Sequence, residues 1–328
     1  MRLKRLLGTA LVLATCGGAG AAWAAGPADY PSRPVTVVIP YGAGGPTDTV
    51  GRIVAEAVSQ ELGGRLVVEN VAGAGGTVGA GRVANADPDG YTLLFNHIGM
   101  ATAPGFYPTI PFAPVGDFKP IGQVADVPMT LIGRGDLPAK DLAGLIAHVK
   151  AQGSTVTIAH AGPGTASYLC ALLLQNQTGI APTQVSYNRG FAPAMIDLMA
   201  GRIDLICDQT STTTKAIGSG TVRAFGVTTR ERLPFLPDVP TMDEGGLKGF
   251  ELAIWHGFYA PKGTPQPVLD RLTAALGKAL QSPMLRERYG QIGAVPVSQA
   301  AATPDGLAAK LSAEIARWTP VITAAQGK

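Results

Sequence analysis

The chain has 328 residues, of which 46% are hydrophobic and only 15% are charged, a composition that excludes an intrinsically disordered protein. It holds 26 Lys and Arg residues against 23 Asp and Glu residues, but three of the basic residues lie within the first five positions. The rest of the chain is therefore neutral, and it contains no basic run that would indicate nucleic-acid or anionic-membrane binding.

The N-terminal residues predict a cleaved signal peptide. A basic segment (residues 2–5), an apolar run (6–15) and an A-x-A cleavage signal (22–24) follow one another, as secretory leaders require. The apolar run is too short to span a bilayer as a helix. We expect cleavage after Ala24 and a periplasmic mature protein. The alternative is a lipid anchor at Cys16, although the residues before it fit a lipobox poorly.

Short runs rich in Val and Ile alternate with helical patterns through the rest of the chain. Near-continuous apolar runs of this kind are typical of strands buried on both faces of a parallel sheet. The alternation with helices predicts βαβ units arranged in two sheets. The expected strands are residues 35–39, 65–69, 92–96, 155–160, 183–186, 204–207 and 223–228.

Local signals also indicate helices. Residues 140–152 carry apolar side chains at i, i+3, i+4 and i+7, and Thr-Pro pairs at 264–265 and 303–304 predict an N-cap followed by Pro in the first turn. We expect the chain to cross into a second domain near residues 126–134 and to return near 250–261. The C-terminal helices would then pack on the first domain.

Two glycine-rich turns each follow a predicted strand and precede a predicted helix: Gly42–Asp48 (GAGGPTD) and His160–Ser167 (HAGPGTAS). Such turns leave backbone N–H groups free at a helix N-terminus, where the helix dipole also favours an anion. Neither turn carries the Lys of a P-loop, which favours a carboxylate over a phosphate. The sequence therefore predicts two anion-binding loops, one in each half of the chain.

Several residues near these loops have alternative roles. The carboxylate of Asp48 can cap a helix, pair with Arg52 or contact a ligand, and the two structural roles are favoured. His97 and His160 are either ligand contacts or buried core histidines. A third glycine loop, residues 72–81, is either part of the ligand crevice at the same sheet edge or a flexible connector.

Catalytic and cofactor signals are weak. A dinucleotide site is disfavoured because Thr47 takes the place of the third glycine of the fingerprint, and we expect no cofactor. The sequence has no G-x-S-x-G, H-E-x-x-H or C-x-x-C motif, so we expect no catalytic residue and no metal ligand. An exported hydrolase using Ser167 with a histidine is an alternative. Cys170 and Cys207 either form a disulfide or remain two buried thiols.

Four segments match, in order, the pattern of one family: YPSRPVTVVIPYGAGGPTDTVGR, NADPDGYTLLF, YNRGFAPAMIDLMAGRIDLICD and LPDVPTMDEGGLKGFELAIWHGFYAPKGTP. Over essentially the whole mature chain, the sequence resembles the periplasmic solute receptors of tripartite tricarboxylate transporters, the Bug proteins of the TctC type. The resemblance implies an α/β protein of the type II periplasmic-binding-protein fold, with two α/β lobes joined by crossing hinge strands. It places lobe one at 25–127 plus 253–328 and lobe two at 128–252.

The resemblance also implies a function. The protein would be a receptor, not an enzyme, that binds a small carboxylate between the lobes and delivers it to large and small membrane subunits of a transporter. The ligand would be a di- or tricarboxylate, an acidic amino acid or an aromatic acid. We expect a monomer that has no nucleic-acid partner. The alternative is a receptor of the same fold that senses a carboxylate for a signalling partner.

Ligand contacts are expected from the glycine loops of both lobes, from Tyr187 and Asp208 at family positions, and from residues that depart from the family pattern. Among the departures, Arg189 either contacts a second carboxylate or faces solvent, and Asn96-His97 replaces small hydroxylated residues on the wall of lobe one. The expected ligand-binding residues are Tyr41, Gly42, Gly44, Gly45, Thr47, Asp48, Gly75, Gly76, Asn96, His97, His160, Gly162, Gly164, Thr165, Ala166, Ser167, Tyr187, Arg189 and Asp208.

Overall fold

The computed structural model describes residues 30–188 and 190–325, so the predicted signal peptide and Arg189 lie outside the described residues. The strands are β1 (Val35–Ile39), β2 (Leu66–Asn70), β3 (Thr92–His97), β4 (Phe118–Arg134), β5 (Thr157–His160), β6 (Thr183–Ser186), β7 (Leu205–Gln209), β8 (Val222–Val227), β9 (Ala253–Pro261) and β10 (Val295–Pro296). The helices are α1 (Pro46–Leu62), α2 (Thr77–Ala84), α3 (Gly99–Phe106), α4 (Leu142–Gln152), α5 (Ala166–Thr178), α6 (Ala192–Met199), α7 (Thr210–Gly218), α8 (Gln266–Ala279), α9 (Pro283–Gln291) and α10 (Pro304–Ala325), with short 3-10 turns η2 (Ala74–Gly76) and η3 (Gly153–Thr155).

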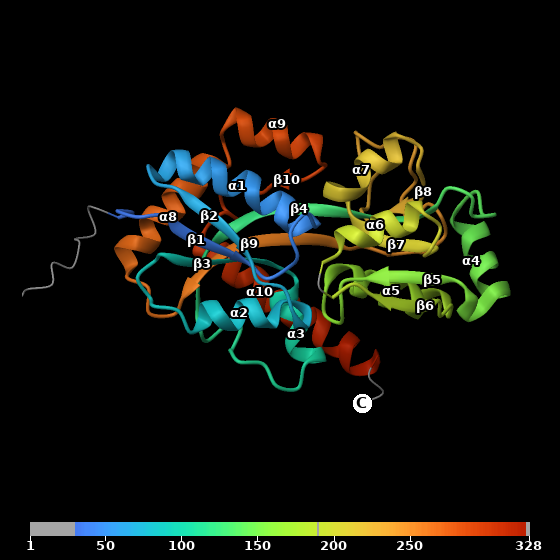
Figure 1. Ribbon diagram of the computed structural model, residues 1–328, viewed down its shortest axis with the longest axis horizontal. Helices are drawn as coiled ribbons and strands as arrows, with labels where there is room; N and C mark the ends of the chain where they lie inside the picture. Colours follow the sequence, from blue (N-terminus) through green and yellow to red (C-terminus); the bar gives the residue numbers. More distant parts are fainter. Residues whose placement is uncertain (1–29, 189, 326–328) are drawn as a thin grey trace, which may run out of the picture.

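The strands form two sheet sections with the same internal order. In one section the order is β2-β1-β3-β9-β4, and in the other it is β6-β5-β7-β4-β8. The first three strands of each section run parallel, and the next strand runs antiparallel to them. We refer to β1–β3, β9 and β10 with α1–α3 and α8–α10 as lobe one, and to β5–β8 with α4–α7 as lobe two. Figure 1 shows the two lobes side by side.

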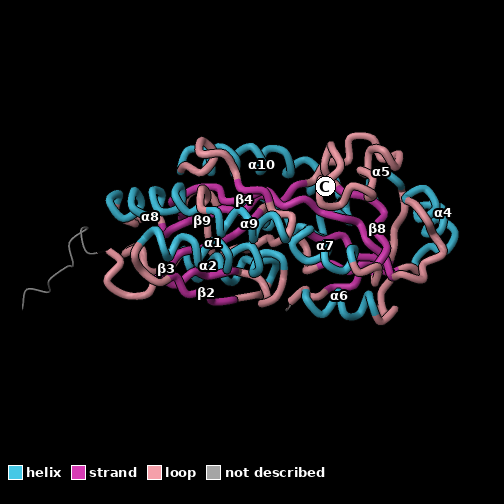
Figure 2. Tube along the Cα trace, turned by 90° about the horizontal axis from the view of Figure 1, so that it is seen from above, coloured by secondary structure: helices cyan, strands magenta, loops and turns pink. Residues whose placement is uncertain are grey.

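Two long strands connect the lobes. β4 pairs with β9 over Phe118–Pro128, and then pairs with β7 and β8 over Met129–Arg134. The change of partners therefore falls between two consecutive residues of one continuous strand. β9 brings the chain back into lobe one, and Figure 1 shows both strands crossing between the lobes. Seen from above in Figure 2, α8 and α4 lie at opposite ends of the molecule.

Helices cover both faces of the sheet in lobe one, which explains the unbroken apolar runs in its strands. In β1, Val35, Val37 and Ile39 belong to the hydrophobic core formed with α1, α8 and α9. Val38 points the other way, into the core that includes residues of α2, α3 and α10. Successive side chains of a strand alternate between faces, so a strand with a core on each side needs apolar residues at nearly every position.

The predicted strands are largely confirmed, but three strands of the structure, β4, β9 and β10, were not predicted. The bounds of β1 and β6 agree with the prediction, and the other five predicted strands differ by one or two residues at one or both ends. Thr155, for example, belongs to η3 rather than to β5. The long strands β4 and β9 were expected only as crossover segments. β4 contains Pro120 and Pro128, residues that argue against a central strand, and the structure accommodates Pro120 at a shift of register with β9.

One of the two predicted Thr-Pro helix starts is confirmed. The hydroxyl of Thr303 accepts a hydrogen bond from the backbone N–H of Gly306 at 3.1 Å, as an N-cap does, and α10 begins at Pro304. The other start lies one residue later than expected. Pro265 is the N-cap of α8, because the hydroxyl of Thr264 donates to the carbonyl of Pro261 instead. No helix within the described ranges has the length and apolarity that a membrane span needs.

Candidate functional site: the cleft between the lobes

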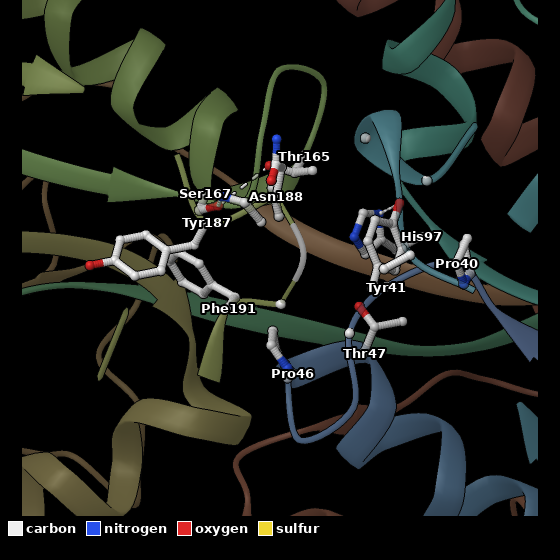
Figure 3. Close-up of a pocket in the computed structure, with 18 of the residues that line it drawn as sticks. Pro40, Tyr41, Pro46, Thr47, His97, Thr165, Ser167, Tyr187, Asn188 and Phe191 are labelled. Carbon is white, nitrogen blue, oxygen red and sulfur yellow. Dashed lines mark hydrogen bonds between the residues drawn. The ribbon is translucent and has the colours of Figure 1, made fainter. Parts of the chain in front are cut away.

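A cleft lies where the carboxyl ends of the parallel strands of both lobes meet, the usual ligand position in open α/β sheets. Figure 3 shows Tyr41 and His97 on the lobe-one side facing Ser167, Asn188 and Phe191 on the lobe-two side. The two walls approach closely and leave a free volume of about 40 Å³. The lining residues are Pro40, Tyr41, Gly42, Gly45, Pro46, Thr47, Ala72, Gly73, Gly75, Gly76, His97, Ala161, Thr165, Ala166, Ser167, Tyr187, Asn188, Gly190, Phe191, Asp208 and Gln209.

The lobe-two wall is built around the start of α5. Thr165 is the N-cap in an extended conformation, and its hydroxyl donates to the carbonyl of Gly162 at 2.6 Å. The hydroxyl of Ser167 accepts from the N–H of Ala161 at 3.0 Å. Both hydroxyls thus fold the loop back on itself, and no described side chain caps the N–H groups of the first helical turn. These N–H groups are the donors available to an anion in the cleft.

The start of α1 forms the matching part of the lobe-one wall. Gly45 is the N-cap, and Pro46 occupies the first turn, where a missing N–H costs nothing. Asp48 does not line the cleft, and its carboxylate accepts from the N–H of Gly44, from Arg52 and from Asn70. Burial of Asp48 raises its pKa, but these hydrogen bonds outweigh burial and lower the pKa below the ordinary value. The structural role expected for Asp48 is confirmed.

His97 ends β3 and closes the lobe-one wall. Its Nδ1 accepts a hydrogen bond from the N–H of Gly99 at 2.9 Å, and its ring stacks on Tyr41 with centroids 4.2 Å apart. The hydroxyl of Tyr41 donates to the side-chain oxygen of Asn96 at 2.9 Å. Burial, and then the neighbouring His256, hold the pKa of His97 well below its usual value, so the ring is neutral. Asn96 itself does not line the cleft.

His160 ends β5 with the same local hydrogen bond but a different surrounding. Its Nδ1 accepts from the N–H of Gly162 at 2.9 Å, and its ring lies edge-on to Tyr168. Burial lowers the pKa of His160 to about 4, and the residue does not line the cleft. In the structure His160 therefore shapes the loop after β5 rather than facing the cavity.

The remaining lobe-two residues come from the ends of β6 and β7. The hydroxyl of Tyr187 donates to Asp197 on α6 at 2.6 Å, so this residue presents its ring rather than its hydroxyl to the cleft (Figure 3). Asp208 is 4% exposed and accepts from the hydroxyl of Thr212 at 2.6 Å. Burial raises the pKa of Asp208 to about 7. Next to it, Gln209 is 1% exposed, and its side-chain oxygen has no partner among the described residues.

Direct contacts hold the two lobes together at the mouth of the cleft. The hydroxyl of Thr102 on α3 donates to the carbonyl of Gly164 at 2.7 Å, and the hydroxyl of Tyr107 donates to the carbonyl of Pro163 at 3.3 Å. The backbone of Gly75 also approaches this carbonyl, since a Cβ at Gly75 would lie 2.6 Å from it. The structure thus represents the protein with its lobes closed.

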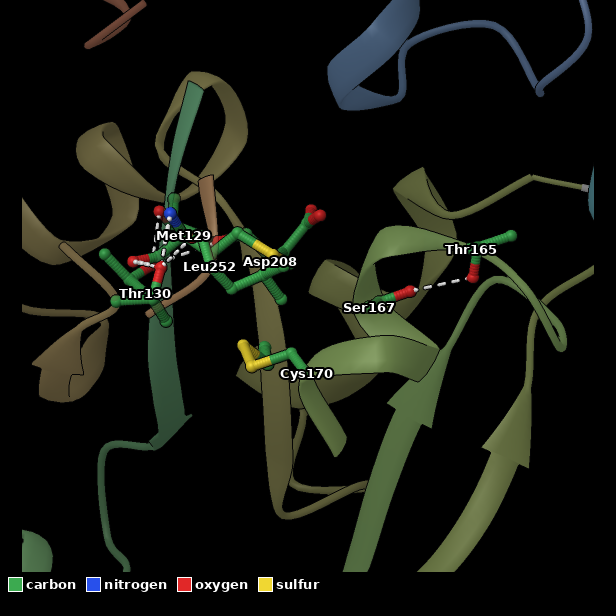
Figure 4. The surroundings of a disulfide bond; sticks show 10 residues. Met129, Thr130, Thr165, Ser167, Cys170, Asp208 and Leu252 are labelled. Carbon is green, nitrogen blue, oxygen red and sulfur yellow. Dashed lines mark hydrogen bonds between the residues drawn. A yellow bond between two sulfur atoms is a disulfide. The ribbon is translucent and has the colours of Figure 1, made fainter. Parts of the chain in front are cut away.

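A disulfide lies directly behind the lobe-two wall. Cys170 on α5 and Cys207 on β7 are bonded, with Cα atoms 6.1 Å apart. Figure 4 shows Thr165, Ser167 and Asp208 around this bond. The structure thereby decides between the two alternatives that the sequence left open, and the bond ties the start of α5 to the strand that ends at Asp208.

Most of the predicted ligand-binding residues meet in this cleft. Twelve of the nineteen line it: Tyr41, Gly42, Gly45, Thr47, Gly75, Gly76, His97, Thr165, Ala166, Ser167, Tyr187 and Asp208. Gly44 lines a neighbouring cavity of about 410 Å³, and Arg189 lies outside the described residues. The other five do not line the cleft: Asp48, Asn96, His160, Gly162 and Gly164.

Nine lining residues were not among the predicted ligand contacts. Four of them lie in the predicted glycine loops (Pro46, Ala72, Gly73 and Ala161), and the other five are Pro40, Asn188, Gly190, Phe191 and Gln209. Asn188 and Gln209 each follow a residue that was singled out, Tyr187 and Asp208, so extending each strand end by one position finds them. Phe191 has no such signal. No Lys or Arg belongs to the cleft lining among the described residues, and the same residues contain no group of three or more potential metal ligands. Among the described lining residues, N–H and O–H groups are therefore the donors available to an anion.

Comparison with known proteins shows which family has this sequence and fold. The family profile described as the tripartite tricarboxylate transporter family receptor (TctC) matches residues 50–326. A UPF0065 protein from the TAR-I ttuE–ttuC′ intergenic region of Agrobacterium vitis is 51% identical over 296 residues, which cover 90% of this chain and 85% of that protein.

Solved structures agree. The periplasmic binding protein BugD superposes with a TM-score of 0.88 at 47% identity, covering 90% of this chain and 99% of that chain. MatC from Rhodopseudomonas palustris with bound malate superposes with a TM-score of 0.85 at 39% identity, covering 89% of this chain and 100% of that chain. A further R. palustris protein with adipate superposes with a TM-score of 0.84 at 32% identity, covering 89% of this chain and 97% of that chain.

The fold and cleft are those of a type II periplasmic binding protein, with two α/β lobes joined by crossing strands, as the resemblance implied. The chain belongs to the tripartite tricarboxylate transporter receptor family, which includes the Bug proteins. Receptors of this family are periplasmic, bind small carboxylates and work with transporter components. Its homologues are solute-binding proteins rather than enzymes.

Proposed function

We propose that this protein binds a small organic carboxylate in the cleft and delivers it to the membrane subunits of a tripartite tricarboxylate-type transporter. The observation that carries the proposal is the pair of helix starts, α1 and α5, that meet across the cleft with no Lys or Arg among its described lining residues. Backbone N–H groups at two helix N-termini suit an anion. Malate and adipate bound to two similar structures support the carboxylate.

The chemistry of the cleft offers little to a hydrolase. The hydroxyl of Ser167 contacts the N–H of Ala161 and the hydroxyl of Thr165, neither of which is a base. The Nδ1 atoms of His97 and His160 each accept from a backbone N–H, and neither histidine is hydrogen-bonded to a serine among the described residues. A nucleophile needs a base within hydrogen-bond reach. We therefore propose a receptor without enzymatic activity. We also propose that it uses no cofactor and is a monomer.

We propose lobe boundaries at 25–127 plus 253–328 for lobe one and 128–252 for lobe two. The change of β4 partners after Pro128 and the start of β9 at Ala253 support these limits. The ligand-contact proposal keeps the nineteen predicted residues, with the twelve that line the cleft as direct contacts and the others as parts of its loops. We further propose export with cleavage after Ala24, which N-terminal sequencing of the secreted protein tests.

Binding is tested by thermal unfolding with a panel of mono-, di- and tricarboxylates. A ligand that binds only the folded state raises the melting temperature, and at a concentration of about 100 times Kd it adds roughly 2.7 kcal/mol to the free energy of unfolding. Mass spectrometry of acid released from freshly purified protein identifies the natural ligand. No shift with any acid, and no co-purified acid, would lead us to abandon the proposal. Ligand-dependent pull-down of the membrane subunits, rather than of a signalling protein, tests the delivery step.

A further inference from the structure

His97 has a proton position that the surrounding backbone determines. The N–H of Gly99 donates to Nδ1 at 2.9 Å, so Nδ1 must carry a lone pair and not a hydrogen. The hydroxyl of Tyr41 lies 3.2 Å from the same nitrogen but sends its hydrogen to Asn96. A neutral imidazole has one N–H, and here it must be on Nε2. His97 is therefore held as a hydrogen-bond donor at Nε2.

This donor is open to the cleft. His97 is 3% exposed, it lines the cavity, and Figure 3 shows its second ring nitrogen directed toward the lobe-two side. Nε2 has no hydrogen-bond partner among the described residues, yet it is not sealed in the interior. The contrast is His256, whose Nε2 is fully buried without a partner. A partner for the Nε2 of His97 must therefore come from whatever fills the cleft.

The ring cannot easily turn to find another partner. Tyr41 stacks on one face, with centroids 4.2 Å apart, and His256 lies edge-on with centroids 5.7 Å apart. Turning the ring over would also place a hydrogen on the Gly99 side and break the bond to its N–H. The charge of the ring is fixed as well, because burial keeps the pKa of His97 well below its usual value.

From this geometry we infer that His97 recognises the second end of the ligand by a hydrogen bond. The first carboxylate lies at the start of α5 in lobe two, and an oxygen at the opposite end accepts the Nε2–H of His97 across the cleft. The preferred ligands are acids with an oxygen acceptor at both ends, above all dicarboxylates, and not acids with an apolar far end. This inference rests on the proposed function, because it concerns the same cleft.

The walls of the closed cleft approach closely and leave only about 40 Å³ of free volume, so a bound acid contacts both walls. With the lobes closed, one end of a small acid placed against α5 leaves its other end close to lobe one. An apolar group there would leave the Nε2–H unpaired and buried, which is the costly situation for a polar group. We call an acid with an oxygen acceptor at both ends two-ended, and an acid with an apolar far end one-ended. We expect a two-ended acid to bind at least about tenfold more tightly than its one-ended counterpart.

The test uses matched pairs of acids in calorimetric titrations: succinate with butyrate, adipate with hexanoate, and terephthalate with benzoate. The first two pairs keep the carbon skeleton and exchange one carboxylate for a methyl group, and the third exchanges one carboxylate for hydrogen. Wild-type protein should prefer the two-ended member of whichever pair binds. If none of the six acids binds, and the wider carboxylate panel and co-purified material also give no ligand, the proposed function fails; an acid found there is compared with its own counterpart that lacks the far oxygen acceptor. If butyrate binds as tightly as succinate, or the equivalent holds for another pair, the function stands and this inference fails.

Two variants separate the ligand role of His97 from its structural role. His97→Asn keeps an acceptor near the Nδ1 position for the N–H of Gly99 but is too short to donate into the cleft. His97→Gln places an amide N–H near the Nε2 position. We expect His97→Asn to weaken the two-ended acid about tenfold and to leave the one-ended acid within about twofold, and His97→Gln to retain part of the preference. Equal weakening of both acids by His97→Asn would overturn the inference.

A spectroscopic measurement serves if His97→Asn does not fold. Nitrogen-15 NMR of wild-type protein should show His97 neutral, with its proton on Nε2, before any ligand is added. The Nε2–H signal should shift with a two-ended acid and remain in place with a one-ended acid. A proton on Nδ1, or the same shift with both acids, would contradict the assignment.

Discussion

Gly75→Ala is expected to weaken ligand binding because the closed lobes leave no room for a methyl group. Gly75 has a φ of +63°, and its added Cβ would lie 2.6 Å from the carbonyl oxygen of Pro163 in lobe two. A carbon and a carbonyl oxygen normally stay about 3.3 Å apart or more, so the lobes must separate by roughly 0.7 Å at this point. Tyr107 is also close, but it belongs to lobe one and opposes the methyl whether the lobes are open or closed.

The size of the effect follows from overpacking. Forcing an extra methyl into a filled contact costs about 1–3 kcal/mol, and this cost falls on the closed state alone. If closing costs about 2 kcal/mol more, apparent affinity drops about 30-fold, because a ligand that needs the closed state must first restore it. The backbone strain of Ala at positive φ, about 1 kcal/mol, affects both states and changes stability rather than affinity.

Gly63→Ala is the matched control. Gly63 ends α1 with a φ of +73°, and a Cβ there meets nothing within 4 Å. Both variants should lose stability in urea from the backbone strain of Ala at positive φ, with an added loss for Gly75→Ala from the contact with Tyr107, while only Gly75→Ala loses affinity in calorimetry. Small-angle scattering of the ligand-saturated protein should show a larger radius of gyration for Gly75→Ala. Equal affinities of the two variants would refute the reasoning, as would full closure of Gly75→Ala at unchanged affinity.

Three further predictions concern single groups. The pKa of Asp208 is raised to about 7 in the folded protein, which therefore keeps this proton at pH values where the unfolded chain ionises. The free energy of unfolding should fall as pH rises from about 4 through 7, by up to about 4 kcal/mol. Asp208→Asn should flatten this slope, measured by urea unfolding at pH 4.5 and 8. Thr102→Val leaves the carbonyl of Gly164 without its 2.7 Å partner and should weaken ligand binding about tenfold by calorimetry, and unchanged affinity would show that this bond does not stabilise closure. Removing the Cys170–Cys207 bond, whose partners are 37 residues apart, should lower the free energy of unfolding by about 4 kcal/mol, and a Cys170→Ala protein should then show no further loss on adding reductant.

The fold was predictable where local pattern and tertiary environment agree. The Val and Ile run identified β1 to the residue, because burial on both faces leaves little room for polar positions. The bounds of β6 also agree with the prediction, but this strand (TQVS) is largely exposed, so two-sided burial is not the reason there. β4 was missed as a strand because Pro120 and Pro128 oppose that assignment locally. Their acceptance depends on a register shift and on a change of partner strands, which arise only when distant segments pair.

The site shows the same division. The glycine loops were identified because a strand, a glycine turn and a helix start are contiguous in sequence. Phe191 belongs to the cleft only because α6 folds beside the other loops, which no local motif indicates. The bond between Cys170 and Cys207 likewise depends on α5 packing against β7, and sequence spacing alone does not determine that proximity.

The crossing strands have a consequence for the order in which the chain can fold. Lobe two draws its own strands β5–β8 from one uninterrupted stretch, whereas β3 must wait for β9 at residues 253–261 to gain its second neighbour. As the chain emerges from synthesis or export, lobe two can complete its sheet while β3 still has an open edge. Open edges pair readily with other chains. A chain truncated before residue 253 would therefore be prone to aggregation, although it contains every strand of lobe two.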